Sequence, residues 1–413
     1  MTRTALVLGA GMIGVSCALA LQKRGITVTL IDRREPGRET SYGNAGVLAA
    51  SSIVPLNNPA LYGKIAGYLG NRHPALNLSW RRALTQPGWL LRFLWEARPS
   101  QARARIAALQ SLTADTVTHH RALMEQAGVL HRLRDTGTLK LWRTQAGHDA
   151  ARAEHDFLKS HGIDSQILDR QGISGIEPGL NPIFPAGLLI PCVGSVDSPG
   201  AVTAAYAALF AERGGRIEQA AVTRLSRAAA GWRAETSTGG SEAEIAVVAL
   251  GPWSGDLLKP LGIDPWLNVE RGYHRHLAPQ AGARLSRTIY DVDGAYYMAP
   301  MEQGIRITSG VDLSLRDAPD VHRQIDAATA AAREALPLGE VIGETWRGAR
   351  PTLPDSLPMI GEAPRHPGLW LAFGNQHIGF STGPITGEII AAMVCGEKPP
   401  IDPAPFRPGR YIR

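Results

Sequence analysis

The chain has 413 residues, of which 44% are hydrophobic and 19% are charged, a composition typical of a globular protein with room for two domains. Lys and Arg exceed Asp and Glu by only 6 charges, and the arginines are spread along the sequence, so a nucleic-acid partner is not expected. The 3 cysteines are isolated from one another, which excludes a CxxC zinc or redox motif and indicates a reduced, cytoplasmic setting.

The first residues carry the pattern of a dinucleotide-binding βαβ unit. An apolar run at 5–8 predicts a strand, the glycine-rich turn 9–14 leads into a helix, and a second strand at 26–31 ends on Asp32. Glycines let a pyrophosphate reach the positive end of the helix, and an acid about 20 residues later accepts the ribose hydroxyls. A glycine turn without a ligand is the alternative. The predicted contacts are Gly9, Ala10, Gly11, Met12, Ile13, Gly14 and Asp32.

The same stretch is too short and too rich in glycine to cross a bilayer, so no transmembrane helix is expected. Directly after it, the segment 40–47 consists mostly of small residues, which would let backbone N–H groups approach a cofactor. This segment resembles the flavin-contacting segment of the D-amino acid oxidase (DAO) superfamily, and within it the bacterial D-amino acid dehydrogenases. The resemblance implies FAD as the cofactor, in contact with Arg33, Ser41, Asn44, Ala45, Gly46 and Val47. An ordinary turn-rich loop is the alternative.

Residues 59–133 are predicted to be mainly helical, and the segment 80–95 gathers three tryptophans and three arginines. Aromatic and arginine side chains suit a membrane surface, so one interpretation is a peripheral contact at the inner face of the bacterial membrane. The pattern favours the other interpretation, a core or dimer-facing helix with solvated arginines. A membrane contact through Trp89 and Phe93, or an oligomer, therefore both stay open.

The middle of the chain is predicted to return to the cofactor domain. Strands are expected at 138–142, 187–192, 216–222, 232–235 and 243–250, with helices over 147–161 and after Pro199. The sequence ALGPWSG at the end of the last strand resembles the second FAD-contacting motif of the superfamily. The resemblance implies contacts from Val222, Ala249, Gly251 and Trp253, while a strand followed by a tight turn is the alternative.

From 265 to 347 the pattern changes to alternating strands without crossover helices, which predicts a mainly antiparallel sheet. A period of two places Arg271 and Tyr273 on one strand face and two histidines on the other. The histidines lack an acidic or cysteine partner in the pattern, so a solvated strand face is expected and no metal site. Comparison with the family favours Tyr297 as a substrate contact, with core packing as the alternative. Arg271, Tyr273 and Tyr297 are therefore candidate catalytic residues.

The closing segment 345–394 resembles the C-terminal signature of the superfamily. The resemblance implies that Arg350 pairs with the substrate carboxylate, since a planar guanidinium binds a carboxylate with two hydrogen bonds; a surface arginine is the alternative. A turn over 374–383 is expected to lead into a helix over 384–394 whose positive end points at the flavin. The implied contacts are Gly374, Gln376, His377, Gly379, Phe380 and Ser381.

His377 is also a catalytic candidate, either as acceptor of a hydrogen bond from the substrate amine or as a support for the flavin. Relatives with covalently bound flavin carry a cysteine near 348–350, and this chain has none there. The sequence therefore predicts non-covalent FAD, which acid precipitation should release.

These observations predict an α/β protein in which a Rossmann-type FAD-binding domain, of the DAO and glutathione-reductase-like kind, is interleaved with a mainly antiparallel substrate domain. The FAD-binding domain is expected at 1–58, 193–262 and 346–413, and the substrate domain at 59–192 and 263–345. The family implies oxidative deamination of a D-amino acid to a 2-oxo acid, by hydride transfer from Cα to flavin N5. Electrons would pass to a quinone or oxygen.

Two alternatives to this function stay open. The first is a dehydrogenase or oxidase of a secondary amine, such as D-hydroxyproline, D-proline, sarcosine or another N-alkyl glycine. The second is a flavoprotein without independent turnover, whose flavin serves assembly or a partner enzyme.

Overall fold

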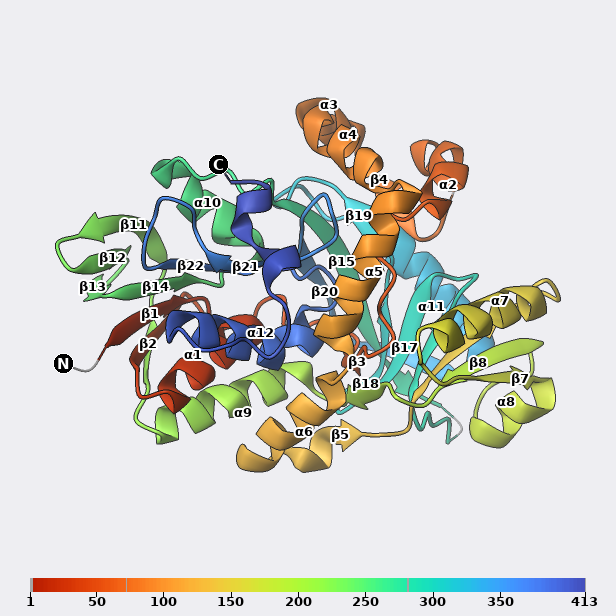
Figure 1. The fold of residues 1–413 in the computed structure, drawn as a ribbon. Helices are drawn as coiled ribbons and strands as arrows, with labels where there is room; N and C mark the ends of the chain where they lie inside the picture. The colour runs from red at the N-terminus through yellow and green to blue at the C-terminus, as the bar shows by residue number, and fades with distance from the viewer. Residues whose placement is uncertain (1–2, 72, 281, 413) are drawn as a thin grey trace.

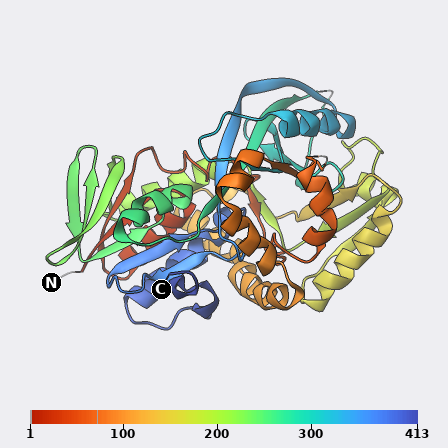
Figure 2. The same cartoon turned by 90° about the horizontal axis from the view of Figure 1, so that it is seen from above.

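The computed structural model describes residues 3–71, 73–280 and 282–412, and it contains two large sheets that lie side by side (Figures 1 and 2). The first sheet has six strands in the order β10-β2-β1-β14-β22-β21, all parallel except β21. These strands are β1 (Thr4–Leu8), β2 (Thr27–Asp32), β10 (Arg216–Gln219), β14 (Ile245–Val248), β21 (Met359–Glu362) and β22 (Leu369–Phe373).

The first sheet is covered on both faces, which explains why its strands read as continuous apolar runs. Val7 faces a core formed with α1 (Met12–Lys23), α9 (Pro199–Glu212) and α12 (Gly379–Val394). The neighbouring residue Leu8 faces the opposite core. That second core is closed by α10 (Ser254–Leu258) and by a small antiparallel sheet of β11 (Val222–Ala228), β12 (Gly231–Thr236) and β13 (Gly239–Ala243).

The second sheet follows the order β4-β19-β15-β18-β17-β16-β6-β8-β7, with β20 paired to β15. It is mainly antiparallel, as the sequence predicted, but β16 and β6 pair in parallel, as do β19 and β4. Its strands are β4 (Leu76–Leu78), β6 (Thr138–Trp142), β7 (Gln166–Asp169), β8 (Ala186–Ile190), β15 (Asn268–Pro279), β16 (Thr288–Asp291), β17 (Tyr296–Met301), β18 (Gly304–Thr308), β19 (Val311–Leu313) and β20 (Leu338–Thr352). The helices α7 (Gly147–Ser160), α8 (Arg170–Ile176) and α11 (Arg323–Ala335) pack against it.

The remaining helices belong to the segment that was predicted to be mainly helical. They are α2 (Ala60–Leu69), α3 (Trp80–Thr85), α4 (Pro87–Glu96), α5 (Pro99–Thr113) and α6 (Thr116–Gln126). In Figure 1, α3 and α4 project at the top of the molecule, whereas α5 and α6 pack against α12. None of the helices in the described ranges is long and apolar enough to traverse a membrane.

Short elements complete the chain. A three-stranded sheet joins β3 (Val47–Leu48), β9 (Gly194–Val196) and β5 (Leu133–Arg134). The 3₁₀ helices are η1 (Leu130–Arg132), η2 (Gly251–Trp253), η3 (Lys259–Leu261), η4 (Ala404–Phe406) and η5 (Pro408–Arg410).

Three details differ from the sequence prediction. The segment 265–347 contains α11, whose buried Ile325, Ala328 and Ala332 have the spacing of a helix, so the absence of a helix was wrongly predicted. Helix α12 begins at Gly379, five residues before the predicted start at 384. The expected boundary between 345 and 346 falls inside β20, because this strand stays paired with β15 up to its end.

The two histidines of β15 are also not on a solvated face. His274 and His276 are only 2% and 4% exposed. Nδ1 of His274 lies 3.0 Å from the Gly43 carbonyl oxygen, and Nε2 of His276 lies 3.0 Å from Nε of Arg306. His274 is covered by the loop around 42–44, which the strand alternation alone could not reveal.

Candidate active site

A cavity of about 660 Å³ extends between the two sheets, within the size range of ligand sites in proteins. One end lies at Asp32, where β2 ends, and is lined by Arg33, Val222 and Trp253. The other end is lined by residues of β15, β17, β18 and β20 in the second sheet, among them Arg350. Both sheets are therefore needed to form the site.

The glycine-rich turn after β1 is close-packed. Gly9 has φ +109°, and a Cβ there would lie 2.4 Å from the Ala249 carbonyl oxygen. A Cβ on Gly14 would lie 1.7 Å from the Gly9 carbonyl oxygen. Only glycine fits at either position, so the turn brings the start of α1 against β14 and leaves its backbone open to the cavity.

At the start of α1, the backbone N–H of Met12 donates to Oγ of Ser41 at 2.9 Å. A Cβ on Gly11 would lie 3.2 Å from this oxygen. Gly11, Met12, Ile13 and Ser41 all line the cavity. Backbone N–H groups at a helix N-terminus attract negative charge, and together with a serine hydroxyl they suit a pyrophosphate.

Asp32 is held in place by the backbone. Its Oδ2 accepts a hydrogen bond from Ala10 N at 2.6 Å, and its Oδ1 accepts one from Arg34 N at 3.0 Å. Burial raises the pKa of Asp32, and these two N–H groups act against the rise. Each carboxylate oxygen keeps a lone pair for a ribose hydroxyl. Beside it, the Arg33 guanidinium lies 4.1 Å from the centre of the Trp253 ring.

The loop after Ser41 is fixed to α12. Oδ1 of Asn44 accepts a hydrogen bond from Gly46 N at 2.7 Å. Oγ of Ser381 accepts one from Ala49 N at 2.9 Å and donates to the Val47 carbonyl oxygen at 3.1 Å. Ser381 thus supports the cavity wall from behind.

Oδ1 of Asn375 and Nε2 of Gln376 are buried at the cavity wall and have no hydrogen-bond partner among the described residues. Gln376 also has φ +50°, a left-handed conformation that is costly for a residue with a side chain. Buried polar groups are normally paired, so these atoms indicate a ligand with both donors and acceptors. The pyrimidine ring of a flavin has both, so the residues present fit the cofactor that the sequence predicts.

Arg350 lies over Gly272, where a Cβ would come within 2.4 Å of Nη2 of the arginine. Its Nη1 has a long contact of 3.5 Å to the Gly310 carbonyl oxygen, and no ion pair to Arg350 is present in the described part of the chain. Burial lowers its pKa, and the nearby Glu270 carboxylate and Tyr297 act against this. The guanidinium is therefore a half-buried cation with capacity for an anionic ligand.

Tyr297 and His377 line the same end of the cavity as Arg350. Burial raises the pKa of Tyr297, so its phenol stays protonated, and its ring centre lies 4.5 Å from that of Tyr290. The His377 side chain is exposed to the cavity, and partial desolvation by the cavity wall together with the charge of Arg350 lowers its pKa to about 4, so its imidazole is neutral at pH 7. Its Nε2 lies 3.3 Å from Oγ of Ser52.

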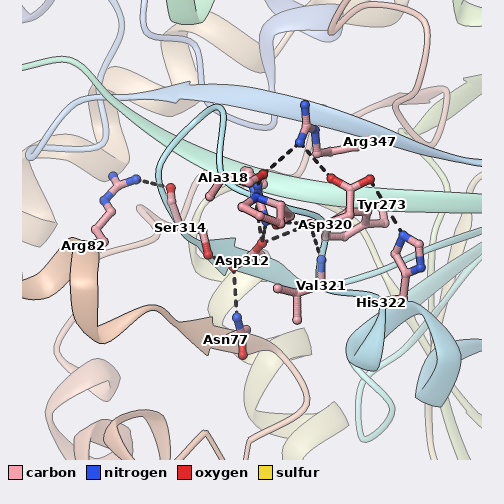
Figure 3. Close-up of polar contacts among 12 residues, drawn as sticks. Asn77, Arg82, Tyr273, Asp312, Ser314, Ala318, Asp320, Val321, His322 and Arg347 are labelled. Carbon is pink, nitrogen blue, oxygen red and sulfur yellow. Dashed lines mark hydrogen bonds and ion pairs between the residues drawn. The ribbon is translucent and has the colours of Figure 1, made fainter.

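Arg271 does not line the cavity and cannot touch a ligand there, which corrects its prediction as a catalytic residue. Its Nη2 donates to Asp312 at 2.7 Å, and both residues are fully buried. Figure 3 shows Asp312 among Asn77, Ser314 and Tyr273, and the Tyr273 hydroxyl donates to Asp312 at 3.1 Å. The strand alternation was right, but the face that carries Glu270 and Gly272 is the one in contact with Arg350. Tyr273 lines the cavity, but its hydroxyl is hydrogen-bonded to Arg271 and Asp312.

The other predicted cofactor contacts divide into two groups. Those on the cavity wall are Gly9, Gly11, Met12, Ile13, Asp32, Arg33, Ser41, Asn44, Ala45, Val47, Val222, Ala249, Gly251, Trp253, Gln376, His377, Gly379 and Phe380. Those that lie behind the wall are Ala10, Gly14, Gly46, Gly374 and Ser381. Their assignment as cofactor contacts stays a prediction.

The charged residues on the cavity wall that the sequence analysis missed include Glu270 and Lys140. Lys140 pairs with Glu154 near the ring of Tyr290. Glu270 stands directly opposite Arg350 in the pairing of β15 with β20. Nothing local in the sequence marks either residue, because only strand pairing brings them to the cavity.

Comparisons with known proteins agree with this geometry. A family model described as FAD dependent oxidoreductase (DAO) matches residues 4–393. A D-amino-acid oxidase of Bradyrhizobium diazoefficiens is 31% identical, with 98% of each chain covered. A D-amino acid dehydrogenase of Granulibacter bethesdensis is 29% identical, with 98% of this chain and 99% of that protein covered. The crystal structure of glycine oxidase from Geobacillus kaustophilus has the same fold, with a TM-score of 0.76, 23% identity and full coverage of both chains.

Proposed function

Given that the chain belongs to the DAO family of FAD-dependent oxidoreductases, we propose that it oxidises a D-amino acid to the imino acid, which water hydrolyses to a 2-oxo acid. The protein is an enzyme that acts on an amine or amino acid. The choice of a D-amino acid is supported by the names of its relatives over nearly the whole chain. Bound FAD supplies the hydride acceptor, its N5 atom.

The observation that carries this proposal is the Arg350 guanidinium on the cavity wall, which has no carboxylate partner within ion-pair distance among the described residues. A guanidinium binds a carboxylate through two parallel hydrogen bonds, which fixes both the position and the orientation of the ligand. The protonated Tyr297 hydroxyl lies at the same end of the cavity as a second donor to the carboxylate. Such positioning is a large part of catalysis when the chemistry resides in the cofactor.

His377 is proposed to contact the amine. Because its pKa is lowered to about 4, the ring is neutral and one nitrogen can accept a hydrogen bond. Support of the flavin is the alternative role for this side chain.

The proposal is tested by anaerobic titration of the purified yellow protein against a panel of D- and L-amino acids. Loss of the visible flavin absorbance with D-amino acids is the expected result. A protein whose flavin is reduced only by L-amino acids, or by none of the panel, is inconsistent with the proposal. Recovery of the absorbance on adding air or a quinone then identifies the electron acceptor.

A secondary amine is the second candidate, favoured by the neighbouring rings of Tyr290 and Tyr297, which are tilted by 30° to each other and give the cavity an aromatic wall suited to a pyrrolidine ring. D-proline, D-hydroxyproline, sarcosine and D-alanine separate the two candidates. Oxidation of D-proline gives a cyclic imine and releases no ammonia, whereas oxidation of D-alanine releases one ammonia for each turnover.

We also propose that α3 and α4 contact an anionic membrane surface. Their exposed side chains include Trp80, Leu84, Leu91 and Trp95, with 55%, 79%, 68% and 55% exposure. Arg98 lies 3.4 Å from the centre of the Trp95 ring. The only acid of α3 and α4 is Glu96, which is buried and paired with Arg105. Exposed apolar side chains and the exposed Arg81, which has no acidic partner among the described residues, suit an anionic interface, whereas Arg92 is paired with Glu96 and Arg82 is buried.

Substitution of Trp89 and Phe93, the residues that the sequence suggested for a membrane contact, would not test this contact. Trp89 is buried, stacks on Phe93 at 5.0 Å and donates to the Trp266 carbonyl oxygen. Flotation with anionic liposomes should instead compare the parent with a Leu91→Ser and Trp95→Ser variant, which we expect to remain unbound. Equal flotation of both, or a parent that forms a dimer and does not float, contradicts the proposal.

A further inference from the structure

Glu270 is a buried carboxylate on the cavity wall, and no assigned role accounts for it. The residue lies on β15, directly opposite Arg350 on β20, so both side chains are on the same face of the sheet. It is only 4% exposed, and its Oε2 has no hydrogen-bond partner among the described residues. The other buried acids of the second sheet are paired: Asp312 with Arg271 and Asp291 with Arg143.

A buried carboxylate with an unpaired oxygen opposes folding, so its presence needs a reason. Burial raises the pKa of Glu270, and Arg350, Thr352 and Arg82 reduce this rise. Neither arginine comes within ion-pair distance of Glu270 in the described part of the chain. The carboxylate thus has room for a cation or a donor that enters from the cavity.

An amino acid carries the two groups that this pair of side chains lacks. Its carboxylate and its ammonium are attached to the same carbon and so lie close together. The guanidinium of Arg350 and the carboxylate of Glu270 are also neighbours, because their residues are directly opposite each other on paired strands. With the substrate carboxylate on Arg350, the nitrogen on the same carbon lies beside Glu270. The charges are then complementary on both sides of Cα.

We propose that Glu270 binds the α-ammonium group of the substrate and takes a proton from its nitrogen, an inference that rests on the function proposed above. The N–H bond breaks, an O–H bond forms on the carboxyl group, and the nitrogen keeps the electron pair. The Cα–H bond then breaks, its hydrogen passes to FAD as a hydride with both bonding electrons, and the nitrogen lone pair forms the C=N bond of the iminium product. The raised pKa of Glu270 favours it as a proton acceptor.

The test uses the holoenzyme with its flavin chemically reduced, because the bound amino acid then has no hydride acceptor and binding is measured without turnover. Anaerobic calorimetry compares D-alanine with isobutyrate, in which a methyl group replaces the ammonium. It also compares D-proline with cyclopentanecarboxylate, in which CH₂ replaces the NH₂⁺ group. In the parent protein at least one amino acid should bind more tightly than its carboxylate analogue.

Glu270→Gln keeps the shape of the side chain and removes its charge. We expect amino acid affinity to fall roughly 10- to 100-fold, as for loss of a hydrogen bond to a charged group, while affinity for the carboxylate analogue stays equal or rises. Glu177→Gln is the matched control, because Glu177 is 1% exposed but is paired with Arg287 away from the cavity. It should change neither affinity.

A second measurement tests the proton transfer. In rapid mixing of oxidised holoenzyme with saturating D-alanine or D-proline, the rate of flavin reduction should fall at least about tenfold in Glu270→Gln. Glu270→Asp keeps the charge on a shorter side chain and should lose amino acid affinity selectively, which provides the test if the glutamine variant does not fold. Equal loss for both ligands of a pair, or no loss at all, overturns the binding role, and an unchanged reduction rate overturns the proton transfer.

These outcomes are distinct from failure of the proposed function. If no amino acid reduces the flavin of the parent protein, the proposed function fails and Glu270 has no substrate to bind. If the flavin is reduced but the glutamine variant shows no change in selectivity, only the inference about Glu270 fails.

Discussion

The position of the Arg350 guanidinium requires a neighbour without a side chain, and its charge is not paired with an acid of the described chain. The guanidinium occupies space that a Cβ on Gly272 would take, and the adjacent strand positions carry Glu270 and Gly348. The charge of Arg350 interacts with that of Glu270 over a distance, but no carboxylate in the described ranges lies within ion-pair distance of the guanidinium. The resulting geometry leaves this half-buried cation free to bind a carboxylate.

Replacement of Arg350 by Lys should raise KM for the amino acid substrate by roughly 10- to 100-fold, because a lysine cannot bind a carboxylate through two parallel hydrogen bonds. Steady-state kinetics measures this, and the visible spectrum should show unchanged FAD content. Arg347→Lys is the matched control, since Arg347 lies on the same strand but pairs with the exposed Asp320. Similar KM values for the two variants would remove Arg350 from the substrate site.

The turn after β1 gives a prediction for the cofactor alone. A Cβ on Gly11 would lie 3.2 Å from Oγ of Ser41 and would fill space at the start of α1, so Gly11→Ala should weaken FAD binding about tenfold or more. Equilibrium dialysis or flavin fluorescence measures the dissociation constant. Gly63→Ala is the control, because a Cβ there meets nothing within 4 Å. Equal FAD affinity in both variants would show that the phosphates bind elsewhere.

At the scale of elements, α12 shows how one helix depends on another. Pro384 lies inside α12 and has no N–H, so the carbonyl oxygen of Phe380 lacks its helical partner. His120 of α6 replaces that partner, with Nε2 at 2.9 Å from the Phe380 oxygen, and Thr116 donates to the next carbonyl, of Ser381. The first turn of α12, which lines the cavity, is therefore stabilised from α6.

Replacement of His120 by Ala should destabilise the protein by about 1–3 kcal/mol, because the Phe380 carbonyl loses its donor in a buried place. Thermal unfolding measures the loss, and FAD should dissociate more readily because Phe380 lies on the cavity wall. His119→Ala is the control, since the His119 side chain is only half-buried. If the two variants unfold at the same temperature, the Phe380 carbonyl is not supported by His120.

Features that depend on nearby residues were predictable from the sequence, and features that depend on distant residues were not. The βαβ unit up to Asp32 was predictable because its strand, turn glycines and acid are all local signals. The start of α12 was placed at Pro384 because proline favours a first helical turn, whereas the true start depends on His120, far away in the sequence. Likewise Glu270 meets Arg350 only through strand pairing, so its place in the site could not be read locally.

At the scale of the whole molecule, the site depends on segments that meet only in the folded chain. The loop around 42–44 lines the cavity and is held by the second sheet, through His274, His276 and Arg306. Nη1 of Arg306 donates to the Asn44 carbonyl oxygen at 2.6 Å. The first sheet therefore supplies the nucleotide end of the cavity, and the second sheet fixes the loop that joins the two ends.

This arrangement predicts instability in acid. Burial, followed by the charge of Arg306, lowers the pKa of His276 to about 4 and that of His274 to about 2, and burial lowers that of His120 to about 4. The unfolded chain, with histidine pKa values near 6.5, binds more protons than the folded chain between about pH 6.5 and 4. Stability should therefore fall as pH drops through this window, by up to roughly 1.4 kcal/mol per pH unit for each histidine.

Thermal unfolding between pH 7.5 and 4.5, followed together with release of FAD fluorescence, measures this dependence. The raised pKa values of Asp32 and Glu270 have the opposite effect on stability, because their protonation in acid favours the folded state. The three buried histidines outnumber these two acids, so a net loss of stability in acid is expected. His276→Gln isolates the effect, since a glutamine oxygen can still accept from Arg306 but does not titrate. Its stability should decrease less steeply with acid than that of the parent, and equal slopes would show that His276 is already charged in the folded protein.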